Sequence, residues 1–546
     1  MKLKNFRGFP LLFVLLALPM LACSMFGIGG DDDVPSNAVV VNVTANTTAA
    51  TWLETAVTAF NESKTETSSG APAFVVLNAV ESGEAVGQLQ NDPSVALWLP
   101  EDAVWTDVLA DAGDGSFAGD CVSVAQSPLV IGMWRDVAEA LGWPGLPLGW
   151  LDIGSLAADP AAWDYYSGGT LGESFKLGHT HPGLSGSGAS TLLAVVQAAQ
   201  SKTDAVSVAD IDQPIVQASV GAFEGGVTWF SSSTQTLAQT MAERGMEYLT
   251  AGIMYEANVI QLSRDDIVAI YPLEGTFMAE FPACIRDSVT STEKEAAVLF
   301  RDFLLSEAGQ QLAADNGLRS VNTAVSLPAV DTIDPTQPTT TFAQPSVSTV
   351  FAVQDLWQEE RKDVNLVMLL DTSGSMRGSK IDNMQEAAVQ FVQQMGDDDY
   401  ISIIAFSTEP ELIIRHVLVG ENRDKIVRAV RDLRAIGDTT LFDAIGDGAA
   451  LLTETTLPST ANAMVVLTDG QDTRSYRFNS ATAMQEATAN NATVFTIAYG
   501  GDADENTLER LAIQANGNFF VGDEASIAAI YEEMSAAFGG SVGVGR

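Results

Sequence analysis

The sequence predicts an α/β protein built from two large domains. Between residues 38 and 325, short apolar β-branched runs alternate with helical patterns, beginning with Val39–Val43, a helix over Thr51–Ser63 and Phe74–Leu77. The alternation returns between residues 363 and 540, where the strand runs are almost continuously apolar, as in strands buried on both faces. This pattern indicates mainly parallel sheets covered by helices. A chain of 546 residues is also too long for one ordinary core.

The same patterns place further elements in each domain. In the first domain, further helices are predicted near Gly83–Leu89 and Thr191–Ser201, and one long amphipathic helix is predicted from Thr292 to about Asn316. The other elements of its alternating pattern are Val95–Leu99, Ser127–Met133, Tyr248–Gln261 and Ile267–Tyr271. Strands of the second are predicted at Asn365–Leu370, Tyr400–Phe406, Glu411–Leu418, Ala463–Leu467, Ala492–Tyr499 and Asn518–Val521. Its helices are predicted at Lys380–Met395, Arg423–Ala435, Leu441–Thr453, Ser480–Asn490, Asp504–Ala515 and Ser526–Phe538.

Residues 326–362 are predicted to join the two domains. Pro, Thr, Ser and Gln dominate from Ser326 to about Ser348, which is typical of an extended linker. A short helix around Val350–Lys362 then leads into the second domain.

The charge of the chain restricts its partners. Seventy acidic residues against 27 basic ones give a formal net charge of -43. Such a chain repels nucleic acid and anionic headgroups, because binding to polyanions needs clustered Lys and Arg. It favours cations and basic partners. Alternatively, the scattered acidic residues serve solubility or adapt the protein to a salty or acidic habitat.

The N-terminus has the pattern of an export signal. Lys2, Lys4 and Arg7 precede an apolar run from Phe9 to Ala22, so residues 1-22 are predicted to be a signal peptide. Met20-Leu21-Ala22-Cys23 resembles a bacterial lipobox, which implies that Cys23 is diacylated. Residues 23-37, with Gly29-Gly30-Asp31-Asp32-Asp33, are predicted to form a flexible leash. The protein would then be held at the cell membrane by lipid alone, facing outside the cytoplasm. The alternative is an uncleaved anchor helix.

Two further cysteines, Cys121 and Cys284, remain after Cys23. An even pair in an oxidising compartment favours a disulfide, and two free buried thiols are the alternative. Three histidines and no cysteine cluster argue against a zinc site.

Oxygen-bearing side chains follow the first strand of the second domain. Asp371, Ser373 and Ser375 come directly after an apolar run, at the end of a strand where ligands bind in open α/β sheets. An aspartate and two hydroxyls at alternating positions can surround one hard cation. Thr439, in a loop that opens a helix, and Asp469, at the end of another buried strand, supply two more oxygens.

Asp371-Thr372-Ser373-Gly374-Ser375, Gly437-Asp438-Thr439 and Thr468-Asp469-Gly470 together resemble the metal-ion-dependent adhesion site of von Willebrand factor A domains. The resemblance covers residues 363-540 and implies a Rossmann-like doubly wound fold. It implies that Asp371, Ser373, Ser375, Thr439 and Asp469 hold Mg2+, or alternatively Mn2+ or Ca2+, and that a protein partner adds an acidic side chain to the metal.

Two aspartates of this segment have other expected roles. Asp438 stands where many members of the family have Gly, and its charge would favour Ca2+ or Mn2+ or weaken the attraction of a carboxylate. Asp443 is interpreted as a helix or second-layer residue. Alternatively, the metal only stabilises the loops.

The first domain resembles bacterial extracellular solute-binding proteins of the two-lobed, type 2 periplasmic class. The resemblance rests on Ala125–Gly132, Leu177–Pro182, Ser185–Gly188, Tyr255-Glu256, Tyr271–Thr276 and Phe300–Ser306. It implies that Cys121 and Cys284 lie on adjacent segments that cross between the lobes. The two-lobed domain is expected to be followed by the von Willebrand A domain, with residues 541-546 as a tail.

The resemblance also implies a ligand cleft between the lobes. Ser82, Ser127, Ser187 and Gly188 would present hydroxyls and amides at helix starts, which suits a small molecule or an anion. Each serine is equally compatible with an N-cap or a turn. His179 and His181 are interpreted as loop structure rather than metal ligands.

The sequence therefore favours a cell-surface binding or adhesion lipoprotein. The alternative is a solute receptor for an ABC-type importer, with the A domain as an accessory partner module. An enzyme is not expected, since no nucleophile elbow, P-loop or His-Glu-x-x-His helix occurs. The whole arrangement resembles bacterial proteins that join a substrate-binding domain to a von Willebrand A domain.

Overall fold

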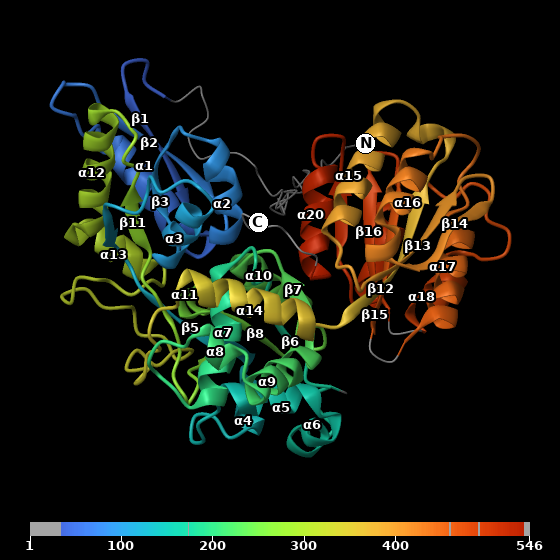
Figure 1. The fold of residues 1–546 in the computed structure, drawn as a ribbon, viewed down its shortest axis with the longest axis horizontal. Helices are drawn as coiled ribbons and strands as arrows, with labels where there is room; N and C mark the ends of the chain where they lie inside the picture. The colour runs from blue at the N-terminus through green and yellow to red at the C-terminus, as the bar shows by residue number, and fades with distance from the viewer. Residues whose placement is uncertain (1–33, 173, 458–459, 490–491, 540–546) are drawn as a thin grey trace, which may run out of the picture.

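The computed structural model describes residues 34–172, 174–457, 460–489 and 492–539, which form three sheet-centred bodies (Figure 1). Two of these bodies are the lobes of the first domain, and the third is the second domain. The predicted signal peptide, Cys23 and the tail 541-546 lie outside the described residues. In the part of the chain that is described, no helix combines the length and apolar character needed to cross a membrane.

The first lobe has a sheet in the order β2-β1-β3-β11-β4. Its strands are β1 (Val39–Ala45), β2 (Ala73–Ala79), β3 (Val95–Leu99), β4 (Cys121–Ser123) and β11 (Pro282–Ile285). Its helices are α1 (Thr47–Ser63), α2 (Ser82–Asn91), α3 (Val104–Asp111), α12 (Ser291–Leu305) and α13 (Glu307–Asp315). Cys121 and Cys284 are directly opposed on antiparallel β4 and β11, and a disulfide joins them.

The second lobe has a sheet in the order β10-β5-β8-β6-β7, with β9 also paired to β5. Its strands are β5 (Ser127–Trp134), β6 (Leu177–Thr180), β7 (Val227–Ser231), β8 (Ala251–Tyr255), β9 (Ile267–Ile270) and β10 (Met278–Ala279). Its helices are α4 (Arg135–Ala140), α5 (Trp150–Ala158), α6 (Pro160–Ser167), α7 (Gly186–Gln200), α8 (Val208–Ile211), α9 (Pro214–Gly225), α10 (Thr234–Arg244) and α11 (Glu256–Gln261). The chain crosses between the lobes from β4 to β5 and returns from β10 to β11.

The single long helix predicted from Thr292 to Asn316 is wrong, because the structure has two helices there. Ser306 takes an extended conformation with ψ of 160°, which ends α12. Its hydroxyl then accepts a hydrogen bond from the backbone N–H of Gly309 and so caps α13. A serine is a good N-cap but a weak helix former, so local capping prevails over the continuous amphipathic pattern.

The Pro-rich segment is hydrogen-bonded to the second lobe, so it is not a free spacer between the domains. The Ala269 N–H donates to Thr332 O, and the Phe342 N–H donates to Thr276 O. The Phe342 ring packs edge-on against Phe277 at 5.3 Å. The segment therefore runs along the second lobe, and α14 (Val347–Glu360) packs on α7, α8 and α9 before the second domain begins.

The second domain has one sheet in the order β14-β13-β12-β15-β16-β17. All neighbours are parallel except β13 and β14. The strands are β12 (Asp363–Asp371), β13 (Tyr400–Phe406), β14 (Pro410–Leu418), β15 (Thr460–Thr468), β16 (Thr493–Tyr499) and β17 (Phe519–Gly522). The helices are α15 (Ser379–Gln394), α16 (Val419–Arg431), α17 (Leu441–Thr455), α18 (Ser480–Thr488), α19 (Glu505–Gln514) and α20 (Ile527–Ala537), with a 3-10 turn at Gly374–Met376.

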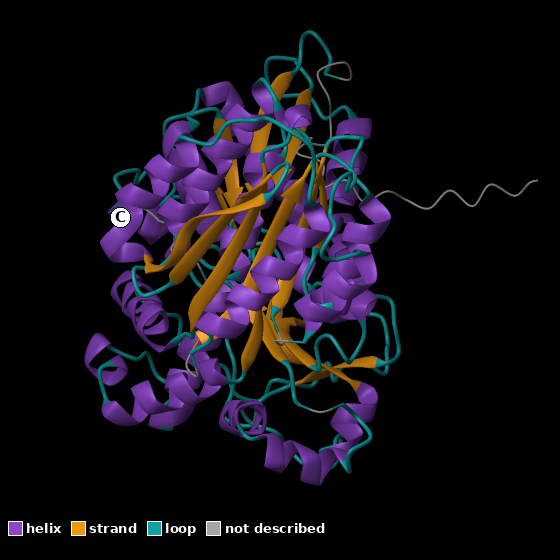
Figure 2. Ribbon diagram, turned by 90° about the vertical axis from the view of Figure 1, so that its right-hand side faces the viewer, coloured by secondary structure: helices purple, strands orange, loops and turns teal. Residues whose placement is uncertain are grey.

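Helices cover both faces of this sheet, as Figure 2 shows for the whole molecule. Helix α15 packs against α16 and α20, whereas α18 packs against α17 and α19. The central strands β12, β15 and β16 are therefore buried on both faces, in agreement with their continuous apolar runs.

The second domain docks on the second lobe through the amino ends of its strands. Trp229 of β7 stacks on Phe495 of β16 with 6.0 Å between the ring centroids. Arg244 at the end of α10 donates hydrogen bonds to Gly517 O and Asn518 Oδ1.

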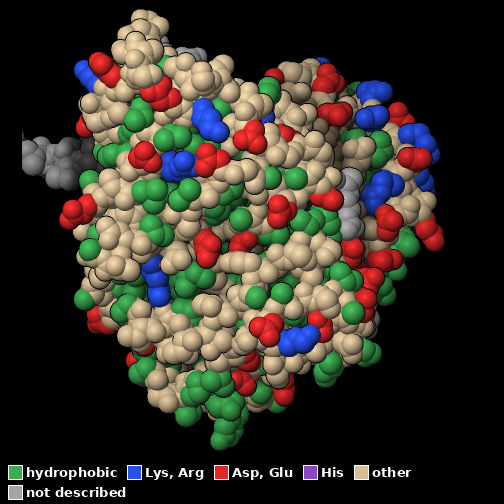
Figure 3. Space-filling view, turned by 60° about the vertical axis from the view of Figure 1, so that its left-hand side comes forward, with side chains coloured by type: hydrophobic (Ala, Val, Ile, Leu, Met, Phe, Trp, Pro, Cys, Tyr) green, Lys and Arg blue, Asp and Glu red, His purple; other side chains and the backbone are tan. Residues whose placement is uncertain are grey.

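On the face shown in Figure 3, acidic side chains are spread across the surface rather than gathered in one patch.

Candidate functional site

The strand order of the second domain creates a switch point between β12 and β15. Chain connections leave these adjacent parallel strands in opposite directions along the sheet, so a space opens at their carboxyl ends. Asp371 is the last residue of β12, and Asp469 directly follows β15. Both carboxylates are fully buried. The topology therefore brings the two predicted metal carboxylates to one place.

A chain of hydrogen bonds links four of the five predicted metal residues. Asp371 Oδ1 accepts from the Ser373 N–H at 2.8 Å, and the Ser373 and Ser375 hydroxyl oxygens lie 2.8 Å apart. The Ser375 hydroxyl donates to Asp469 Oδ1 at 2.6 Å. Two carboxylates and two hydroxyls thus converge from segments nearly a hundred residues apart in the sequence.

Thr439 approaches the same group from the loop before α17. A methyl group on Gly470 would lie 3.8 Å from Thr439 Oγ1 and 4.0 Å from Ser375 Oγ, so these hydroxyls flank one backbone position. Gly437 adopts φ of +91°, which favours glycine, and its carbonyl accepts from the Gly374 N–H at 3.0 Å. This hydrogen bond therefore connects the loop that carries Thr439 to the loop that carries Ser373 and Ser375, which we call the serine loop.

Two further polar side chains contact the carboxylates of the site, and the sequence did not predict these contacts. Thr468 donates its hydroxyl to Asp371 Oδ2 at 2.6 Å, which orients that carboxylate. Lys380, in the first turn of α15, places Nζ 2.6 Å from Asp469 Oδ2. The only sequence signal for Lys380 was its place five residues after Ser375. The local sequence does not predict that its side chain reaches Asp469, which lies 89 residues further along the chain.

The two flanking aspartates have structural partners. Asp438 forms an exposed ion pair with Arg474 at 2.9 Å, so a cation already offsets its charge. Asp443 is buried and accepts hydrogen bonds from the backbone N–H groups of Tyr476, Arg477 and Phe478. These bonds lower the pKa of Asp443 despite its burial. Asp443 therefore holds the loop after β15.

The donor set suits a hard cation that prefers oxygen ligands. Within the described residues, no three His, Cys, Asp or Glu side chains are grouped so that they could hold a metal, so an ion here would depend on hydroxyl ligands. Ser373, Ser375 and Thr439 supply such oxygens, and Mg2+ accepts hydroxyls, carboxylates and water. Burial raises the pKa of Asp371 to about 6, because burial disfavours the charged form of the carboxylate.

The serines predicted to line the interlobe cleft are hydrogen-bonded to neighbouring residues in this structure. Ser187 bonds to the Thr180 and Thr234 hydroxyls at 2.7 Å each, and Gly188 lies against the Thr180 carbonyl, where a Cβ would not fit. Ser127 accepts a hydrogen bond from the Ala257 N–H at the start of α11. Its role in the structure is therefore that of a helix cap.

The start of α2, predicted to offer free amides to an anion, is occupied by the second lobe. The N–H groups of Gly83 and Glu84 donate to the Leu184 carbonyl at 2.8 and 3.2 Å. The Ser82 hydroxyl donates to the Glu101 carboxylate. In this closed arrangement, these groups are not available to an anion.

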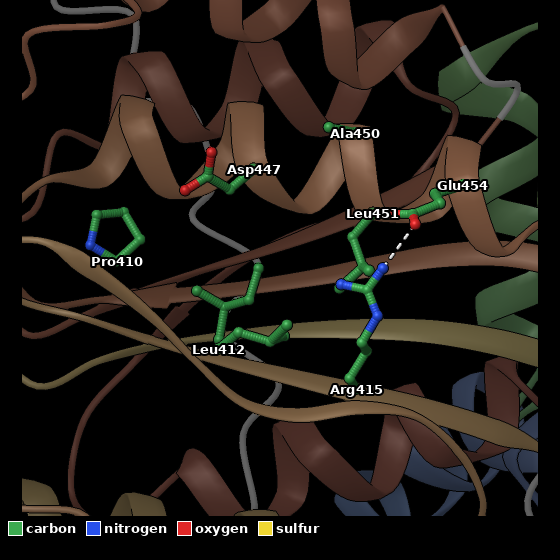
Figure 4. Close-up of a pocket in the computed structure, with 8 residues that line it drawn as sticks. Pro410, Leu412, Arg415, Asp447, Ala450, Leu451 and Glu454 are labelled. Atoms are coloured by element: carbon green, nitrogen blue, oxygen red, sulfur yellow. Dashed lines mark ion pairs between the residues drawn. The ribbon is translucent and has the colours of Figure 1, made fainter.

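One surface cavity of the second domain lies elsewhere. It measures about 250 Å3 and lies between β14 and α17, where Figure 4 shows Arg415 paired with Glu454. None of the five predicted metal residues lines it.

The two domains match two different family models. Residues 41–319, more than half of the chain, match the family model of the bacterial extracellular solute-binding protein. The chain belongs to this family. Residues 365–533 of this solute-binding protein match the von Willebrand factor type A domain. The matched segments are binding or adhesion types of domain.

The curated relatives match less than a third of this solute-binding protein. An uncharacterized protein of Synechocystis sp. is 28% identical over 160 residues, which cover 29% of this chain and 38% of the relative. Human inter-alpha-trypsin inhibitor heavy chain H4 is 30% identical over 169 residues, which cover 28% of this chain and 17% of the relative. The chain thus spans well under half of the length of either relative.

Two solved structures each align with part of this chain. A von Willebrand factor type A protein from Catenulispora acidiphila covers 32% of this chain and 42% of its own, with 23% identity and a TM-score of 0.30. A periplasmic thiamin binding protein covers 60% of this chain and 98% of its own, with 13% identity and a TM-score of 0.44.

Proposed function

We propose that this solute-binding protein is a cell-surface lipoprotein that binds a protein partner through Mg2+ held by its A domain. The ligands would be Asp371, Ser373, Ser375, Thr439 and Asp469. The observation that carries the proposal is the convergence of these hydroxyls and carboxylates at the switch point of the sheet. Mn2+ and Ca2+ are the alternative ions.

The charge of the site suits recognition of an acidic side chain. The two carboxylates offset the double charge of the ion, and neutral hydroxyls donate little further charge, so the bound ion would remain attractive to a carboxylate of the partner. Ser375 is exposed, whereas Asp371 lies fully buried beneath it. The approach to the ion is therefore from the side of the serine loop.

The docking of the domains supports access to this face. Val364, Asn462 and Thr493, near the amino ends of β12, β15 and β16, line a pocket together with Val227 and Trp229 of the second lobe. The proposed ligands lie at the carboxyl ends of β12 and β15. A partner could thus reach the metal without displacing the solute-binding domain.

The proposed location rests on the sequence pattern before residue 34. The lipobox-like Met20–Cys23 supports attachment to the outer face of the cell membrane through a lipid on Cys23, and the net charge of -43 argues against nucleic acid as a partner. Binding rather than catalysis is proposed for both domains.

The second candidate is a solute receptor for an ABC-type importer, with the A domain as an accessory. Membership of the solute-binding family favours it. Tight capture of a small solute by the first domain would support this function, with or without metal in the A domain.

Calorimetric titration of the full chain with Mg2+, Mn2+ and Ca2+ tests the first candidate. Saturable binding should be lost in Asp371→Ala and kept in Asp424→Ala, which changes an exposed aspartate of α16. Binding of a partner from surface-protein extracts should then disappear in chelator and in Asp371→Ala. An absence of metal binding to the folded wild-type chain would reject this mechanism.

A further inference from the structure

Two glutamates of the first lobe are enclosed at its contact with the second lobe. Glu81 precedes α2 and Glu101 follows β3, and each is about 1% exposed. The Asn46 amide donates to Glu81 Oε2 at 3.1 Å and to Glu101 Oε2 at 2.9 Å. The hydroxyls of Thr47 and Ser82 donate to Glu81 and Glu101, respectively. The two carboxylates thus share one buried polar network.

The second lobe closes on this pair with two helix starts. The N–H of Thr234, the first residue of α10, donates to Glu81 Oε1 at 3.1 Å. Glu101 Oε1 lies against Gly186, the first residue of α7, so closely that a Cβ there would be 1.5 Å from it. Helix starts attract negative charge. The carboxylates of one lobe therefore contact two helix starts of the other.

The pair lies among other acidic groups. The charged groups that act on Glu101 include Glu81 and Asp102, which are both acidic. The ionisable groups that face the pair are Asp102, Glu84 of α2, Tyr255 at the end of β8 and, beyond Asp102, Glu280 and Asp107. All are acidic or neutral.

Burial, followed by the charge of Glu81, raises the pKa of Glu101 to about 8, and burial also raises the pKa of Glu81. Glu101 Oε1 is buried without a hydrogen-bond partner. A closed cleft therefore costs free energy when both glutamates are ionised, because two like charges are removed from water together.

We propose that Glu81 and Glu101 form a proton-dependent latch that keeps the two lobes closed while the pair holds at least one proton. Opening the lobes exposes the pair to water and to the release of that proton. The latch concerns the first domain and does not depend on metal in the A domain. It would make access to the interlobe cleft a function of pH.

The pH window follows from the two states of Glu101. Its ordinary pKa is 4.5 and its value in the closed state is about 8. Closure is therefore fully favoured below about pH 4.5 and is weakened by up to tenfold per pH unit until about pH 8, after which the effect levels off. Between pH 5 and 9, the population of open protein should rise.

Amide hydrogen exchange of the full chain in chelator tests this latch. The amides of Gly83 and Glu84 report directly, because both donate to Leu184 across the cleft. Glu101→Gln keeps the shape of the side chain without its charge, and Glu139→Gln changes an exposed glutamate of α4 as a control. Comparing variants at each pH removes the intrinsic effect of pH on exchange.

The wild type and Glu139→Gln should exchange these two amides at least tenfold faster than Glu101→Gln at pH 8, and about equally fast at pH 4. Glu81→Gln provides a second neutral variant if Glu101→Gln does not fold. Equal protection in all variants from pH 5 to 9 would overturn the latch. Restoration of closure at pH 8 by a divalent cation without chelator would also overturn it, since a metal rather than a proton would then hold the pair.

Discussion

Lys380 Nζ lies 2.6 Å from Asp469 Oδ2, on the carboxylate that we expect to face the metal. The lysine is partly buried in the first turn of α15, and the aspartate is fully buried. A tethered ammonium and a divalent ion would thus compete for the charge of one carboxylate. This relationship makes Lys380 a determinant of metal affinity.

Removing the charge of Lys380 is expected to tighten metal binding. Lys380→Met keeps most of the length of the chain but removes the repulsion between the ammonium and the ion. Mg2+ affinity should rise about tenfold, equivalent to ~1.4 kcal/mol, in a calorimetric titration. Lys380→Arg, which keeps the charge, should bind like the wild type. Weaker binding in Lys380→Met would instead mean that the lysine positions Asp469 for the ion.

Metal affinity should decrease in acid. Mg2+ binds the ionised carboxylate, and burial raises the pKa of Asp371 to about 6. The affinity should therefore fall by up to tenfold per pH unit below about pH 6, measured by titration between pH 5 and 8. An affinity that is constant over this range would show that Asp371 is not a ligand or is ionised throughout.

The stability of the metal-free A domain should have the opposite pH dependence. A carboxyl whose pKa rises on folding contributes stability that is complete below its ordinary value of 3.8 and is lost as the pH rises through about 6. Without metal, the Tm of the A-domain transition should fall between pH 4 and 7, whereas saturating Mg2+ should reverse this fall. Asp371→Asn, which cannot ionise, should remove this component from the metal-free profile.

The disulfide should stabilise the first domain alone. It joins residues 163 positions apart, so it restricts a long loop of the unfolded chain. The double variant Cys121→Ala, Cys284→Ala should lower the free energy of unfolding of that domain by about 2–5 kcal/mol in denaturant titration. Metal binding by the A domain provides the internal control and should not change.

Arg244 should hold the A domain against the second lobe. It donates to Gly517 O at 2.7 Å and to Asn518 Oδ1 at 3.0 Å, between α10 and the start of β17. Arg244→Ala should weaken this contact by about 1–2 kcal/mol and speed amide exchange in residues 515–522. Arg510→Ala removes an exposed arginine whose hydrogen bonds stay within α19, and it should leave this exchange unchanged.

Local signals predicted most of the secondary structure because they depend on neighbouring residues alone. The continuous apolar runs of β12 and β15 indicated central strands, and both strands are paired and buried in the sheet. The long helix after Thr292 was wrong because periodicity continues through Ser306, whereas the backbone does not. A single capping hydroxyl leaves little trace in an amphipathic pattern.

The sequence by itself determined the α/β class, the two domains and the residues that meet at the ends of β12 and β15, since strand ends and hydroxyl spacing are local features. Only the tertiary structure decided that Lys380 reaches Asp469, that the Pro-rich segment packs on the second lobe, and that Glu81 and Glu101 share a buried network. These features depend on contacts between segments far apart in the chain. The free energy of these contacts comes from burial and from charges at short range, and neither can be predicted from a local sequence pattern.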